Sequence, residues 1–147
     1  MKHFRHATLA LALAFLSNAA LGSEDAGVVK TSKGTVAVER GGQRLSAPVG
    51  TRIFASDRIT TGADGSVGIT LRDNTMLTAG PNSSVDLNKF AFDTTTHAGV
   101  IDATVKRGTL AVISGKVAKA TPEAVSFSAP GMTLGVRGTS FVIDAGQ

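Results

Sequence analysis

The 147-residue sequence contains no cysteine, no tryptophan and no tyrosine. Without cysteine the chain forms no disulfide, carries no lipid on an N-terminal cysteine and builds no Cys/His zinc site. Without tryptophan and tyrosine it has few of the aromatic platforms on which sugars and bases stack. The core of the folded chain therefore consists mainly of Val, Ile, Leu and Ala.

Groups that catalyse reactions are also scarce. After residue 22 the only histidine is His97, which lies in a polar stretch, and a histidine in such a loop is usually solvated. The aspartates are spread singly, and several stand at expected turns, as Asp64 and Asp73 do. No Ser–His–Asp or Ser–Lys arrangement can be recognised. We expect no enzyme, no catalytic residue, no cofactor and no metal site.

The N-terminus has the pattern of a secretory signal peptide. Lys2 and Arg5 precede the apolar run "ATLALALAFL" at 7–16, and Ala20 and Gly22 are the small residues before a cut at Ser23. The run is shorter than the roughly 20 residues that span a bilayer core. We expect a signal peptide at 1–22, one domain at 23–147, no membrane span in the mature chain, and a periplasmic or secreted location.

The positive charge of the chain does not indicate nucleic-acid binding. The formal net charge is +4, and removing Lys2 and Arg5 from the 15 basic residues leaves 13 against 11 acidic ones. The remaining basic residues are scattered, whereas a surface that binds phosphate backbones needs them clustered.

The mature sequence consists of short β-type segments separated by turns. "GTVAVER" (34–40), Gly41–Gly42 and "QRLSA" predict a hairpin with a type I′ turn, and "SVGITLR" (66–72) places its apolar residues on one face. Asp73–Asn74 and "GPNSS" (80–84) predict further turns. We expect loops at 92–99 and 119–124, and no segment shows helical periodicity over ten residues. This pattern predicts an all-β fold, a single domain of many short strands arranged as a β-sandwich or a β-solenoid-like structure, with no substantial helix after the signal peptide.

The stretch "TLGVRGTSFVID" (133–144) combines strand residues with two glycines. Its apolar positions change from even numbers, at Leu134 and Val136, to odd numbers, at Phe141 and Ile143. A one-residue bulge near Gly138 within a single strand would bring all four side chains to one face.

Three stretches in this order resemble the FecR domain, the periplasmic module of iron-dicitrate-type sensor regulators. They are "VGTRIFASDRITTGADGSVGITLRDNTMLTAGPNSSVDL" (49–87), "GTLAVISGKV" (108–117) and "APGMTLGVRGTSFVID" (129–144). The resemblance covers about residues 28–144. It implies an all-β fold and protein–protein signalling rather than catalysis.

In the regulators this domain lies between a transmembrane helix and a C-terminal segment that meets an outer-membrane transporter. A cytoplasmic part there controls a sigma factor. Here a cleavable signal stands in place of the cytoplasmic part, and the sequence stops soon after the Arg-Gly-Thr motif. We therefore expect a stand-alone exported module that carries no signal to a sigma factor by itself.

The motif residues allow two interpretations. Asp57 and Arg137 could form a ligand site, or they could be structural partners, with Arg137 acting as a clamp on carboxylate or carbonyl oxygens. We favour structural roles for the whole set: Asp57, Thr61, Gly62, Asp73, Gly108, Gly135, Arg137, Gly138, Thr139 and Phe141. The expected function is a non-enzymatic protein-interaction and signalling module with an envelope protein as partner; the alternative is a structural domain that binds carbohydrate or peptidoglycan.

Overall fold

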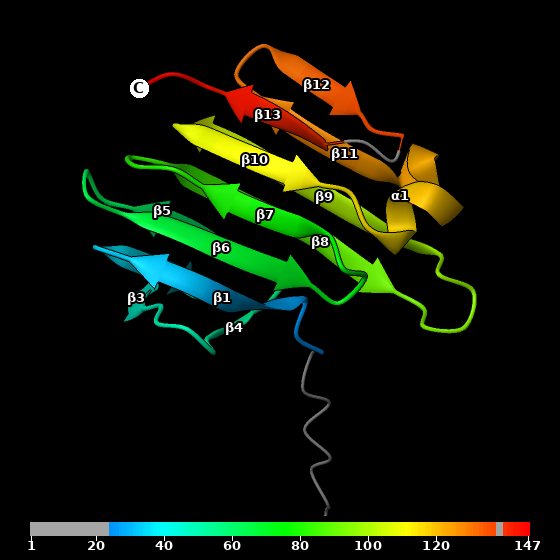
Figure 1. Ribbon diagram of the computed structural model, residues 1–147, viewed down its shortest axis with the longest axis horizontal. Coiled ribbons are helices and arrows are strands. Elements are labelled where there is room, and N and C mark those ends of the chain that lie inside the picture. The colour runs from blue at the N-terminus through cyan, green and yellow to red at the C-terminus, as the bar shows by residue number, and fades with distance from the viewer. Residues whose placement is uncertain (1–23, 138–139) are drawn as a thin grey trace, which may run out of the picture.

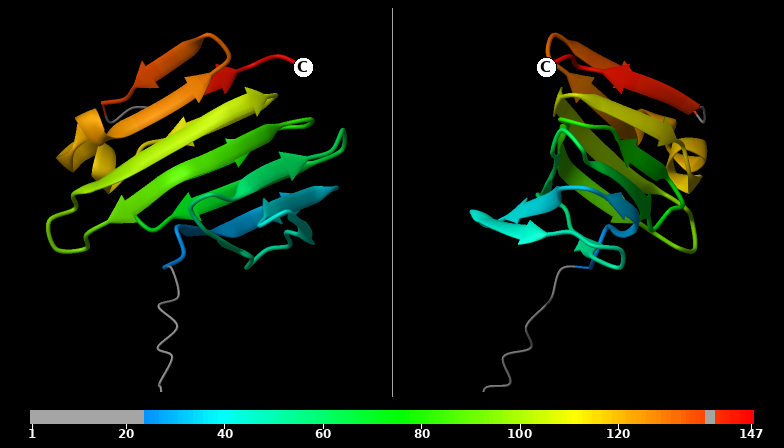
Figure 2. Two further views of the ribbon diagram at one scale, coloured as in Figure 1. Left: turned by 180° about the vertical axis from the view of Figure 1, so that it is seen from behind. Right: turned by 60° about the vertical axis from the view of Figure 1, so that its left-hand side comes forward.

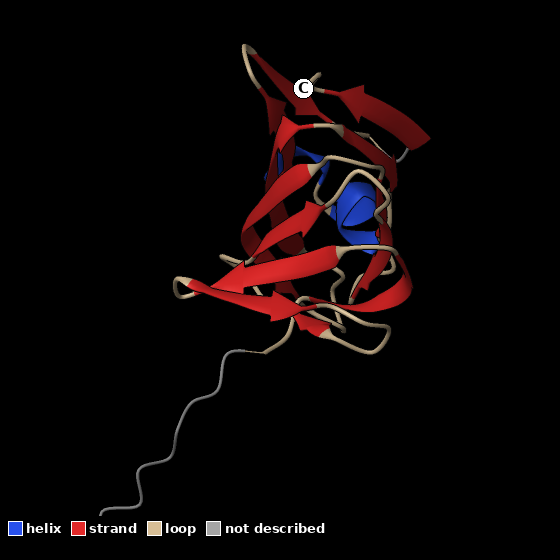
Figure 3. Ribbon diagram, turned by 90° about the vertical axis from the view of Figure 1, so that its left-hand side faces the viewer, coloured by secondary structure: helices blue, strands red, loops and turns tan. Residues whose placement is uncertain are grey.

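The computed structural model of the protein describes residues 24–137 and 140–147. In these ranges the chain forms two β-sheets that face each other, so that the fold is the expected all-β domain in its sandwich form (Figures 1 and 3). The signal peptide expected at 1–22, as well as Gly138 and Thr139, lies outside the described residues.

Six strands form the first sheet, called here the six-stranded sheet. In spatial order they are β13 (Ser140–Asp144), β10 (Thr109–Ile113), β7 (Met76–Ala79), β6 (Ser66–Leu71), β1 (Gly27–Lys33) and β4 (Arg52–Ile53). Every pair of neighbours in this sheet is antiparallel.

The second sheet has seven strands and is called the seven-stranded sheet. In spatial order they are β12 (Met132–Gly135), β11 (Val125–Ala129), β9 (Gly99–Arg107), β8 (Ser84–Phe92), β5 (Arg58–Thr61), β2 (Val36–Arg40) and β3 (Gln43–Ser46). β9 and β11 are parallel, and the other neighbours are antiparallel.

The chain moves back and forth between the sheets while it advances from one end of the sandwich to the other. β1, β2, β3 and β4 lie at the first end, and β12 and β13 lie at the second (Figure 2). This advance is the solenoid-like aspect of the fold, but the mainly antiparallel pairing distinguishes it from a regular parallel solenoid.

Alternation of apolar and polar residues positions the core between the sheets. In β6 the inward side chains Val67, Ile69 and Leu71 are buried, as the sequence predicts. They join a single cluster to which both sheets contribute, with Phe127 and Leu87 from the seven-stranded sheet. The interior is therefore aliphatic, and Phe127 is its only fully buried phenylalanine among the described residues.

The first predicted hairpin is confirmed. Gly41 and Gly42 have φ angles of 57° and 77°, and Arg40 pairs with Gln43 across them. Two positive φ angles in a two-residue loop are the signature of the type I′ turn. This turn fixes the register between β2 and β3.

Two sequence-based expectations are wrong. The stretch 133–144 is not one bulged strand: β12 belongs to the seven-stranded sheet and β13 to the six-stranded sheet. The change from even to odd core positions therefore marks a crossing between sheets. The expected loop at 119–124 overlaps a short helix, α1 (Lys116–Ala120), and a 3-10 turn, η1 (Pro122–Ala124).

Candidate functional site

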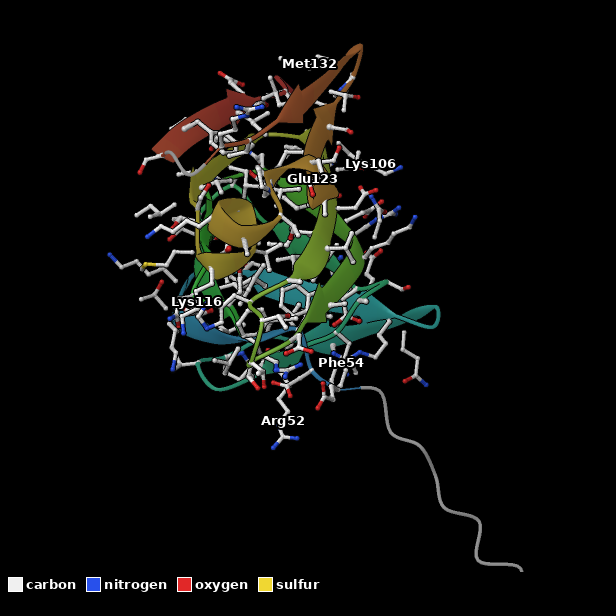
Figure 4. All side chains as sticks on the ribbon, turned by 90° about the vertical axis from the view of Figure 1, so that its right-hand side faces the viewer. Arg52, Phe54, Lys106, Lys116, Glu123 and Met132 are labelled. Atoms are coloured by element: carbon white, nitrogen blue, oxygen red, sulfur yellow. The ribbon has the colours of Figure 1, made fainter. Side chains whose placement is uncertain are left out.

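The second end of the sandwich is left open by two edge strands. β12 is the last strand of the seven-stranded sheet and β13 is the last strand of the six-stranded sheet. Met132 lies at this end, whereas Arg52 and Phe54 lie at the opposite end (Figure 4). The open end carries the stretch that resembles the FecR motif most closely.

A groove of about 600 Å³ lies at this open end. Its wall consists of apolar side chains with one acidic and one basic residue: Pro122, Glu123, Leu134, Gly135, Val136, Arg137, Phe141 and Val142. Phe141 lies between the groove and the core. Its ring packs edge to face against the Phe127 ring, with 5.4 Å between the ring centroids. Such a lining suits an apolar side chain flanked by polar or charged groups.

β13 has an edge without the usual protection against strand pairing. Proteins protect edges with charges, bulges or very short strands. At the other end, β4 has two residues, and β3 carries Arg44, which forms an ion pair with Glu39 at 3.5 Å. β13 has five residues, no charge before Asp144, and a 69% exposed Val142.

Asp57 and Arg137, which could have formed one site, have different surroundings. Asp57 is buried and binds Arg40 through two hydrogen bonds of 2.9 and 2.8 Å. Arg137 is exposed and lines the groove with Gly135 and Phe141. Among the described residues no hydrogen bond joins the Arg137 guanidinium to another residue, and its role as a clamp stays a prediction.

Thr61 and Gly62 lie where β5 ends. The Thr61 hydroxyl donates to the Gly80 carbonyl at 2.6 Å and accepts from the Ser83 amide at 2.9 Å. The Gly62 amide donates to the Thr35 carbonyl at 2.9 Å. These contacts join three turns at one edge of the sandwich.

Asp73 is fully buried and joins two distant segments. Its carboxylate accepts hydrogen bonds from the Thr75 amide and hydroxyl, at 3.1 and 2.8 Å, and from the Val117 amide at 3.1 Å. The Asp73 carbonyl also accepts from the Lys116 amide at 2.9 Å. One side chain thus fixes the β6–β7 turn to the beginning of α1.

Gly108 is the single residue between β9 and β10, where the chain crosses from one sheet to the other. Its φ is +78°, and a Cβ at this position would lie 2.2 Å from the Ser83 hydroxyl oxygen. That oxygen accepts a hydrogen bond from the Thr109 amide at 3.0 Å. The crossing therefore needs glycine both for its backbone angle and for space.

A second cleft, of about 930 Å³, lies near the first end of the sandwich. Phe54, Phe90 and Phe92 line it together with Arg40 and Arg72. Arg40 lies over the Phe54 ring, 4.6 Å from its centroid, and Arg72 forms a 2.8 Å ion pair with Glu24. Sequence reasoning missed this cleft because its aromatic residues come from separate strands and turns.

The described residues offer neither a metal site nor a membrane-spanning helix. Nowhere in 24–137 and 140–147 do three His, Asp or Glu side chains gather in a set that could hold a metal ion. The helices in those ranges have five and three residues, and neither is long and apolar enough to cross a membrane.

The class of protein is thus an all-β sandwich with an apolar groove between two edge strands. The family model for the FecR protein matches residues 57–147, from the buried Asp57 through the groove to the C-terminus. The match covers more than half of the chain, so the chain belongs to the FecR family, a family of regulatory and signalling domains. No curated protein and no solved structure matches the chain.

Proposed function

We propose that this chain is an exported, non-enzymatic signalling module of the cell envelope that binds a protein partner through the open end of its sandwich. The partner adds an extended segment to the outer edge of β13. Its backbone forms hydrogen bonds with β13, and one of its apolar side chains enters the groove. The signal-peptide pattern at 1–22 supports export, and the family supports a signalling role among envelope proteins.

One observation carries this proposal: an edge strand with no charge before its last residue, Asp144, borders an apolar groove. In strand addition, main-chain hydrogen bonds supply affinity and pockets for alternate side chains supply specificity. β13 provides the main-chain hydrogen-bonding groups, and the groove beside Phe141 and Leu134 provides the pocket for a side chain. Glu123 and Arg137 lie in the same wall and can orient a polar or charged neighbour of the inserted side chain.

Site-specific photo-crosslinking in the producing cells tests the proposal. A photoreactive residue replaces Val142, and in a control chain it replaces Arg44 on β3, an exposed residue at the opposite end. Position 142 should give a discrete adduct with an envelope protein, and position 44 should not. Val142→Lys should then abolish binding of the identified partner, because a charge on the edge opposes strand pairing. Equal adducts at both positions, or none at 142, would overturn the proposal.

A second candidate function is binding of carbohydrate or peptidoglycan, and the cleft with three phenylalanines favours it. Calorimetric titration with peptidoglycan fragments tests this function. Phe90→Ala should weaken binding about tenfold or more, as expected for loss of one stacking or apolar contact. Val142→Lys, which leaves the cleft intact, is the control; binding that is insensitive to Phe90→Ala would rule the cleft out.

A further inference from the structure

The outer face of the six-stranded sheet carries few charges over its five longer strands. The exposed Lys30, at the bulge of β1, and Lys33 lie at one flank, and Asp144 on β13 lies at the other. Residues that pair across the strands lie in rows on this face. The first row is Val28, Thr70, Met76, Ile113 and Ser140, and the second is Thr31, Gly68, Thr78, Ala111 and Val142. We call these two rows the uncharged face.

The outer face of the other sheet is entirely different. There Arg44, Glu39, Arg58 and Asp86 pair in register across four strands, so that charges alternate in sign. The nearest oxygens and nitrogens are 3.5, 3.8 and 2.6 Å apart along this row. The two outer faces of the sandwich therefore differ strongly in the charge that they expose to solvent.

Three large apolar side chains project from the uncharged face. Met76, Ile113 and Val142 are 47%, 50% and 69% exposed, and they are half of the six exposed large apolar residues among those described. Residues with short side chains, among them Gly68, Ala111 and Ser140, lie between them. A contiguous apolar and uncharged area of this kind marks an interaction surface.

We propose that the uncharged face binds a second copy of this chain, with a two-fold axis along β7. Such an axis places Met76 against Met76 of the other copy, β6 against its β10, and β1 against its β13. The small Gly68 then faces Ala111, and Ile113 faces Thr70. Because an isologous contact brings each surface against itself, a face whose two central rows carry no charge is suited to it.

The two flanks of the face have opposite charge, and this complementarity favours the second copy as the occupant. In the third row, Lys33 on β1 pairs with Ser66 on β6, and Asp144 on β13 pairs with Thr109 on β10. These two residues end the same row on opposite sides of the sheet. Rotation about β7 therefore brings Lys33 of each copy over Asp144 of the other and forms two equivalent ion pairs.

The size of the face limits the strength of this contact. Five strands and three rows span roughly 24 Å by 20 Å, so each copy buries about 500 Å². The total of about 1,000 Å² lies at the lower limit for a specific interface. The dimer should therefore be weak and concentration-dependent, with a dissociation constant on the order of micromolar or above.

Sedimentation velocity of the purified chain over a range of concentrations tests the dimer. Met76→Lys should weaken association at least tenfold, because it buries two like charges against each other. Met132→Lys is the matched control: Met132 is 48% exposed but lies on β12, outside the face. Both variants change exposed side chains, and equal thermal unfolding will show that each is folded.

Charge exchange tests the orientation. Asp144→Lys should weaken the dimer, and adding Lys33→Asp should restore it. Since the chain has no cysteine, Met76→Cys and Met132→Cys each carry one thiol. A bismaleimide that spans facing sheets, about 10 Å apart, should link only Met76→Cys into dimers.

A chain that is monomeric at all concentrations, a dimer indifferent to Met76→Lys, or a charge exchange without rescue would overturn this inference. Val142 belongs to both surfaces, but Met76 lies away from the groove, so Met76→Lys tests the dimer without changing the groove. If Met76→Lys dissociates the dimer while the partner crosslink at position 142 persists, the two surfaces act separately.

Discussion

Arg40 and Asp57 form a two-point ion pair, in which Nε donates to Oδ1 at 2.9 Å and Nη2 donates to Oδ2 at 2.8 Å. Asp57 is only 1% exposed, and its Oδ2 also accepts from the Phe54 amide at 2.8 Å. The hydrogen bond to Asp57 raises the pKa of Arg40 above its ordinary value. The first residue of the family match is therefore held by an arginine outside that match.

Replacement of Arg40 by alanine should lower the free energy of unfolding by about 2–4 kcal/mol, because it leaves a buried carboxylate without its cation. Arg40→Lys should cost less, since it keeps the charge but loses the two-point geometry. Urea unfolding measures both. Arg44→Ala, which removes a 3.5 Å ion pair at the surface, is the control and should change stability by less than about 0.5 kcal/mol. Equal losses for the two alanine variants would contradict this assignment.

Asp73→Ala should destabilise the protein by about 3 kcal/mol or more, because three buried donors lose their acceptor. The effect should be greatest at the beginning of α1, where the Val117 amide donates to Asp73. Hydrogen exchange should show faster exchange of the Val117 amide than of amides in β6. Asp73→Asn keeps one acceptor oxygen, so its stability should lie between that of the unchanged protein and that of Asp73→Ala. A stability equal to that of Asp73→Ala would show that the charge itself is needed.

Alanine substitutions at two glycines with the same φ angle distinguish the cost of backbone strain from the cost of a steric clash. Gly108 and Gly131 both have φ of +78°, but a Cβ at Gly131 would have no neighbour within 4 Å. Gly131→Ala should cost about 1 kcal/mol, from the backbone alone. Gly108→Ala should cost about 2–5 kcal/mol, because the new methyl group also collides with Ser83. Thermal unfolding measures the difference, and equal costs would show that the Ser83 turn moves aside freely.

The loop between β8 and β9 should open in acid. Hydrogen bonds from the Thr96 and Thr95 amides lower the pKa of Asp93 below its ordinary value. A carboxylate with a lowered pKa in the folded state stabilises that state above its unfolded pKa of about 3.9, and this contribution is lost as the pH falls through the folded value. NMR chemical shifts of the two amides should therefore titrate below about pH 4. In Asp93→Asn this titration should vanish; a midpoint above the ordinary Asp value would contradict the assignment.

Local patterns in the sequence predict the local structure well. Gly41–Gly42 predicts a turn of the observed type, and the alternation in 66–72 predicts the buried face of β6. Both depend on neighbours in the chain, whose backbone angles and side-chain directions are set by adjacent residues. The five residues of α1 escape detection because they are too few to show a helical period.

Long-range relationships could not be predicted in the same way. Nothing near Asp57 in the sequence identifies Arg40 as its partner, because the pair forms only when β2 and β5 lie side by side. For 133–144, a bulged strand and a crossing between sheets give the same change from even to odd core positions. Only the pairing of β12 with β11 and of β13 with β10 distinguishes them. The groove at the open end follows from that crossing and was therefore also missed.

The order in which the chain visits its two sheets has a consequence for how the protein folds. From β3 onward, every strand pairs with a strand that precedes it in the sequence. When the chain leaves a ribosome or a translocation pore N-terminus first, the strand with which each new strand pairs has therefore already emerged. Folding can proceed in step with delivery, and the last segment to arrive completes the open end.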